Sequence, residues 1–218
     1  MKAASLHAMI PLMRQVFSLA FFWFIYMGAL GIFFPYFSLY LRENAHLSGT
    51  QVGLVLSVIP LVGIFAEPFW GQVADRTGAR SRIVVLLTLG ASFGYLALKS
   101  ASTFSAILLA TATLAVFTTA AIPMTVSVSL AMLRDSGPYA FGRLRVWGTF
   151  GFLLLVVGFP WMLRRYQAAY NMVSVPAGPS EPGLGFMFLV TAGLVFLAAL
   201  IGLFLPREGV VSLRASRG

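Results

Sequence analysis

The chain has 218 residues, of which 59% are apolar and only 10% are charged, and its mean hydropathy is +0.90. Soluble domains carry roughly 25% charged residues, so the composition excludes a water-soluble domain and predicts an integral membrane protein. The net charge of +9 does not indicate nucleic acid binding, because the basic residues are scattered among short loops and the two ends rather than gathered in one phosphate-binding patch. No cysteine is present, so thiolate metal sites and disulfides are excluded, and we expect no metal and no cofactor.

A membrane-spanning helix needs about 20 mostly apolar residues, and six segments meet this length. We predict spanning α-helices at Val16–Leu41, Gln51–Ala74, Ile83–Ser102, Phe104–Leu133, Leu144–Leu163 and Leu184–Leu205. The fold class is therefore all-α integral membrane, with a short N-terminal segment, 1–15, ahead of a six-helix bundle over 16–205. The polar, basic tail 206–218 is interpreted as the start of a linker to further sequence.

The distribution of basic residues predicts the orientation. Arg42, Lys99, Arg164 and Arg165 lie on one side of the predicted bundle, and the other 11 of the 15 Lys and Arg residues lie on the opposite side. Because cytoplasmic loops are enriched in Lys and Arg, we expect both termini in the cytoplasm.

Two loops have readable features. Ser48 or Thr50 is expected to cap the second helix, since a hydroxyl oxygen can accept a hydrogen bond from a free backbone N–H. The link 164–183 contains three prolines and two glycines, so it is expected to be irregular and external.

Glycines recur along several predicted helices. They are Gly28 and Gly31, Gly53 and Gly63, Gly90 and Gly94, and Gly148 and Gly151. Small residues at such spacing allow helix backbones to approach closely, so these glycines indicate tight packing.

The connection between the second and third helices reads GQVADRTGARSR, from Gly71 to Arg82. It places Asp75, Arg76 and Arg80 around Gly78, between two long apolar runs. A charged turn with glycines in this position predicts a short loop at a membrane surface.

Glu67 is the one acidic residue well inside a predicted span, and intramembrane ionisable groups are functional candidates. Glu67, Gly71 and Asp75 follow at i, i+4 and i+8, which places them along one stripe of a helix. Two interpretations are open: a charge network at the cytoplasmic end, or a group that takes up a proton or contacts substrate.

Arg143 and Arg145 open the fifth helix and project in different directions, about 200° apart. One of them can reach inward while the other extends to the membrane surface, or both can anchor the helix at the surface. No His, Asp or Glu pair lies at membrane depth, so we expect no enzyme.

The run Gly71-x-x-x-Asp75-Arg76-x-Gly78-x-Arg80 resembles the signature loop of the major facilitator superfamily. Met27-Gly28, Pro35-Tyr36-Phe37, Pro68-Phe69-Trp70-Gly71 and Phe141–Gly148 resemble the lactose permease and phenylpropionate/nucleoside permease branch. Two features depart from this branch: no acidic residue precedes Arg134 on the fourth helix, which argues against a lactose-like sugar, and Ala79 replaces an arginine of the loop.

The resemblance implies the N-terminal half of a proton-coupled symporter of the inner membrane, in which the loop residues Gly71, Asp75, Arg76, Gly78 and Arg80 form a cytoplasmic gate. Tyr26, Met27, Glu67 and Arg145 are the expected cavity residues, with no catalytic residue. The expected partners are a small organic solute and protons, the lipid bilayer, and a second six-helix bundle or a second copy of the chain. The alternative is a six-helix membrane protein that does not transport alone.

Overall fold

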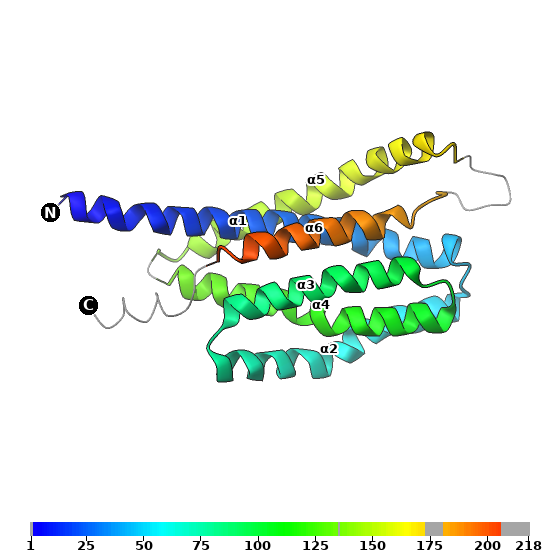
Figure 1. Ribbon diagram of the computed structural model, residues 1–218, viewed down its shortest axis with the longest axis horizontal. Coiled ribbons are helices and arrows are strands. Elements are labelled where there is room, and N and C mark those ends of the chain that lie inside the picture. Colours follow the sequence, from blue (N-terminus) through cyan, green and yellow to red (C-terminus); the bar gives the residue numbers. More distant parts are fainter. Residues whose placement is uncertain (1, 135, 173–180, 206–218) are drawn as a thin grey trace.

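The computed structural model describes residues 2–134, 136–172 and 181–205, and within these residues every regular element is helical (Figure 1). The elements are α1 (Lys2–Leu39), the π-helical turn η1 (Tyr40–Asn44), α2 (Gly49–Thr77), α3 (Arg80–Ser100), α4 (Phe104–Met132), α5 (Ala140–Ala169) and α6 (Phe186–Gly202). The predicted all-α class is confirmed.

Five of the described helices are long and apolar enough to cross a membrane, and α6 is a shorter apolar helix. Tight turns extend α6 at both ends, since the Phe186 N–H donates to the Gly183 carbonyl at 2.9 Å and the Leu205 N–H donates to the Gly202 carbonyl at 3.1 Å. The apolar segment made of α6 and these turns runs over 183–205, close to the predicted sixth span.

Two helix boundaries differ from the prediction. α1 begins at Lys2, so the described residues of the expected N-terminal segment continue the first helix, and α5 extends to Ala169 instead of ending at Leu163. Both additions are rich in Ala, Leu, Met, Arg and Gln, which favour helix outside a membrane as well as inside it. Residues 164–169, which were expected to begin the irregular link, are therefore helical and belong to α5. Residues 173–180 of the link and the tail 206–218 lie outside the described residues.

α2 has a well-defined start. The Gln51 N–H donates to the Ser48 hydroxyl at 3.4 Å, and the Ser48 N–H donates to the Gln51 side-chain oxygen at 3.0 Å. This reciprocal pair satisfies two backbone donors that the helix cannot pair itself, so Ser48 rather than Thr50 is the cap. Two prolines, Pro60 and Pro68, lie inside α2, and the helix bends along its length (Figure 1).

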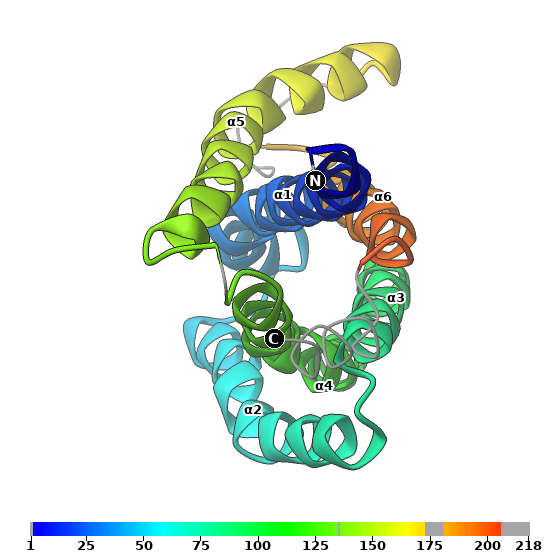
Figure 2. The same cartoon turned by 90° about the vertical axis from the view of Figure 1, so that its left-hand side faces the viewer.

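The helices follow one another around the bundle in the order α5, α1, α6, α3, α4, α2. The two halves of this spatial order are arranged alike. In one half α1 packs against α5 and α6, and in the other half α4 packs against α2 and α3. Figure 2 shows the result along the bundle, with α2 and α5 at its two outer positions.

Glycines allow the closest of these approaches. A Cβ at Gly31 would lie 2.7 Å from the Phe152 carbonyl oxygen, and a Cβ at Gly151 would overlap the Phe24 carbonyl. Gly94 is likewise covered by Leu114 of α4. The prediction of close packing is confirmed at these positions, whereas a Cβ at Gly53 would meet nothing within 4 Å.

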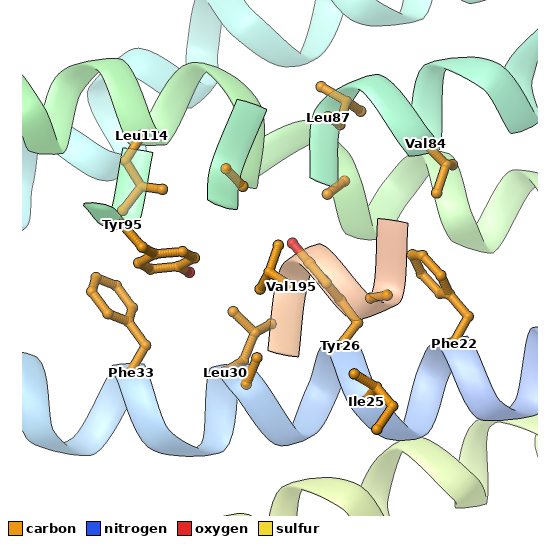
Figure 3. Packing of buried hydrophobic residues seen from close by; sticks show 14 of the residues in the cluster. Phe22, Ile25, Tyr26, Leu30, Phe33, Val84, Leu87, Tyr95, Leu114 and Val195 are labelled. Atoms are coloured by element: carbon orange, nitrogen blue, oxygen red, sulfur yellow. The ribbon is translucent and has the colours of Figure 1, made fainter. Parts of the chain in front are cut away.

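The core lies where α1 faces α3 and α6. Figure 3 shows Phe22, Tyr26 and Phe33 of α1 directed toward α3, where Val84, Leu87 and Tyr95 meet them. By contrast, α2 and α5 expose many large apolar side chains: Leu54, Leu61, Ile64, Phe65, Phe69, Trp147, Phe150, Leu153, Leu154, Val157 and Trp161. These two helices therefore have extensive apolar surface that no described residue covers.

Candidate functional site

The charged turn between α2 and α3 has a defined geometry. Gly78 ends α2 in the left-handed conformation, with φ 62°, which glycine adopts without a Cβ clash. Its N–H donates to the Ala74 carbonyl at 2.9 Å. The reversal brings the Arg80 Nη2 to 3.1 Å from the Asp75 Oδ1, where the two side chains form an ion pair.

A cleft of about 200 Å³ lies beside this ion pair, between α2 and α4. Glu67, Gly71 and Asp75 line it from α2, as the i, i+4, i+8 spacing predicted. A Cβ at Gly71 would meet nothing within 4 Å, so Gly71 leaves this wall open. Arg76 and Gly78 are exposed at the turn and do not line the cleft.

The opposite wall of the cleft comes from α4. Its members are Ala120, Pro123, Met124 and Ser127. The sequence analysis did not assign them, because their apolar and small side chains are typical of any membrane helix. Only the packing of α4 against α2 reveals them.

Glu67 is exposed on α2, with no hydrogen bond or ion pair to any residue that the structure describes. It lies ten residues before the end of α2 at Thr77, or about 15 Å along the helix at 1.5 Å per residue. An ionisable group at this depth is costly against lipid. The side of α2 that carries Glu67 is therefore suited to face protein or water.

Arg145 lies on the other flank of the bundle. Its guanidinium stacks over the Trp23 ring at 4.9 Å from the ring centre, a cation–π contact that fixes the direction of the charge. The Trp23 indole N–H donates to the Ser129 hydroxyl at 3.1 Å, and this hydroxyl donates to the Thr125 carbonyl at 2.6 Å. The chain of contacts connects α5 through α1 to α4.

The remaining two predicted cavity residues, Tyr26 and Met27, point in different directions from α1. Tyr26 is 1% exposed, stacks on Phe22, and is directed into the core (Figure 3); its hydroxyl has no hydrogen-bond partner among the described residues. Met27 faces α5, where a Cβ at Gly148 would lie 2.9 Å from the Met27 Cγ.

The structure thus brings Glu67, Gly71, Asp75 and Arg80 together in one cleft, and it places Arg145 and Met27 at the α1–α5 side. Within the described ranges, no group of three or more His, Asp or Glu residues is positioned to hold a metal ion. The arrangement offers charged side chains that can contact a polar or charged solute.

Comparison with known proteins connects this geometry to a family. The model of the MFS_1 like family matches residues 16–211. The chain is 33% identical over 150 residues to the maltose permease of Geobacillus stearothermophilus, which covers 68% of this chain and 37% of that permease. It is 34% identical over 132 residues to the uncharacterized transporter YwbF of Bacillus subtilis, covering 61% of this chain and 33% of that protein.

Shorter matches and solved structures agree. The lactose permease of Klebsiella oxytoca is 35% identical over 57 residues, which are 26% of this chain and 14% of that permease. A crystal structure of a mutant nucleoside transporter NupG has the same fold, with a TM-score of 0.74 at 17% identity over 94% of this chain and 47% of the transporter. The chain spans less than half the length of each of these proteins.

The chain is a six-helix bundle whose α2–α3 turn resembles the superfamily's loop signature, and the family model matches residues 16–211. The chain is therefore a member of the MFS_1-like family of the major facilitator superfamily, and it has the fold of one six-helix half of these integral membrane transporters.

Proposed function

We propose that the chain is the N-terminal half of a secondary active transporter, which takes up a small organic solute together with protons across the bacterial inner membrane, with both termini in the cytoplasm. The proposal rests mainly on one observation: α2 and α5, the two outer helices, expose large apolar side chains and also carry Glu67 and Arg145. Lipid would not tolerate the Glu67 charge at depth without a partner. A second six-helix bundle against this face would cover the apolar surface and enclose the charged groups.

The two charged groups suit different tasks. Glu67 lies in a cleft, without a described partner, and an ionisable group within a membrane span is a candidate for contact with a proton or a solute. Arg145 is held over Trp23 with its charge available to an anionic or hydroxyl-bearing solute. Met27 faces the same helix, α5, at Gly148, and Tyr26 is buried in the core; a cavity role for either residue stays a prediction.

The α2–α3 turn is proposed to act as the cytoplasmic gate. Asp75 is 73% exposed in its ion pair with Arg80, so its carboxylate retains surface with which to contact a second bundle. In alternating access, such contacts would form in one state of the transporter and break in the other.

The experiment is uptake by proteoliposomes under an imposed pH gradient. The vesicles contain this chain either alone or with the C-terminal bundle of a related permease, and the tested solutes are a disaccharide, a nucleoside and an aromatic acid. Uptake that requires both the added bundle and the gradient would support the proposal. Uptake by the chain alone would show a homodimeric carrier, and absence of uptake with every combination would favour a six-helix protein that does not transport.

A further inference from the structure

A second cavity, of about 140 Å³, lies between α1, α2, α3 and α4, apart from the cleft that ends at the charged turn. Leu30 and Phe33 of α1, Tyr95 of α3 and Leu114 of α4 line it, and Figure 3 shows these four side chains gathered in one place. Thr118 also lines it, at the midpoint of α4, between Phe104 and Met132. The cavity therefore lies near the middle of the membrane.

The walls of this cavity offer almost no hydrogen bonds to a ligand. The Thr118 hydroxyl donates to the Leu114 carbonyl at 3.1 Å, and the Thr119 hydroxyl donates to the Ala115 carbonyl at 2.8 Å, so both donors are already in use. Apart from the Tyr95 hydroxyl, the remaining lining is aliphatic or aromatic, and Phe33 meets Tyr95 edge to face at 4.9 Å. An apolar cavity of about 150 Å³ is large enough to hold benzene, so this cavity fits one aromatic ring.

A carboxylate lies close to the cavity, in the wall of the neighbouring cleft. Gly63, at the midpoint of α2, has no side chain that would separate the Glu67 carboxylate from the Thr119 side chain. A Cβ at Gly63 would lie 3.3 Å from the Thr119 methyl group and 3.5 Å from the Glu67 Oε1. Glu67 is thus within about 7 Å of the Thr119 methyl group on the cavity wall. Its negative charge has no cation paired with it in the described part of the chain, and a buried or membrane-embedded charge is stabilised by a partner of opposite sign.

We propose that the cavity and Glu67 form one binding site for a small aromatic ammonium compound, with the ring between Phe33, Tyr95 and Leu114 and the ammonium at the Glu67 carboxylate.

The test is an equilibrium binding measurement, so it does not depend on whether the chain transports. The purified full chain in lipid nanodiscs is titrated at one pH with three probes of equal ring and chain length: phenethylammonium, 2-phenylethanol and 3-phenylpropionate. We expect phenethylammonium to bind roughly tenfold or more tightly than the other two, because only its ammonium group can form a charge-assisted hydrogen bond to the Glu67 carboxylate. E67Q should abolish this preference, whereas E43Q, which removes a carboxylate outside the cavity, should leave it unchanged.

A second pair of variants tests the ring pocket. T118F places a ring in the cavity and should weaken binding of all three probes at least tenfold. T113F is the matched control, because the Thr113 hydroxyl also bonds to the carbonyl one turn earlier, at 2.9 Å, yet Thr113 does not line the cavity. Equal affinity for the three probes, an unchanged preference in E67Q, or equal effects of T118F and T113F would each overturn the proposal.

Discussion

The close contact between α1 and α5 makes Gly151→Ala a sensitive test of the packing. A methyl group at residue 151 would overlap the Phe24 carbonyl oxygen and lie 3.0 Å from the Phe24 Cα. These are backbone atoms that cannot rotate aside, so the two helices must separate until the contact reaches the ordinary range of about 3.4–4 Å. Overpacking of this kind costs about 1–3 kcal/mol.

The separation has a consequence for the site as well. Arg145 and Trp23 lie on these same two helices, with the guanidinium 4.9 Å from the ring centre. When α5 moves away from α1, this cation–π contact lengthens and the direction of the Arg145 charge is no longer fixed. We therefore expect G151A to lower both the free energy of unfolding and the affinity for a solute that binds Arg145.

Gly158→Ala is the matched control, on the same helix. A Cβ at Gly158 would meet nothing within 4 Å, and alanine in a helix interior is favoured over glycine by about 0.5–1 kcal/mol. The free energy of unfolding is measured by SDS titration in mixed micelles with tryptophan fluorescence as the signal. If G151A were as stable as G158A, the α1–α5 contact described here would be wrong.

Three further predictions concern the turn and the arginine. D75A should change the free energy of unfolding by less than about 1 kcal/mol, because exposed ion pairs contribute little, yet it should impair uptake in the two-bundle vesicle assay; normal uptake would contradict the gate. G78A should destabilise the chain by about 1 kcal/mol in the SDS titration, since alanine is strained at φ 62°. R145K should weaken solute binding several-fold, measured by calorimetry, because lysine keeps the charge but loses the planar stack over Trp23; an unchanged affinity would show that the stack has no role.

The spans were predictable from sequence because the thickness of the bilayer sets the length of an apolar run. The helix ends were not, because hydropathy reports where a segment contacts lipid and not where its helix stops. Residues 2–15 and 164–169 carry charged or polar side chains and are nevertheless helical. Ser48 was predictable as a candidate cap, while the choice between Ser48 and Thr50 depended on which hydroxyl received the Gln51 N–H.

The candidate site was predictable only along one helix at a time. The period of α2 correctly placed Glu67, Gly71 and Asp75 on one stripe, which the structure shows as one wall of the cleft. Tyr26 and Met27 were grouped as cavity residues, but neighbours on a helix project about 100° apart. Accordingly Tyr26 enters the core and Met27 faces α5, a difference that only the rotation of α1 in the bundle determines.

The internal contacts of the bundle bear on how a transporter built from it would move. Backbone contacts at Gly31 and Gly151 leave no space for α1 and α5 to slide. Away from the charged turn, the Gln167 amide donates to the Pro182 carbonyl at 2.9 Å, which ties the end of α5 to the start of α6. The cleft beside Asp75, in contrast, opens onto a surface that no described residue covers. In the transporter proposed above, alternating access would therefore proceed by motion of this bundle as a unit against a second bundle, with the Asp75 turn at the boundary, rather than by repacking among its own six helices.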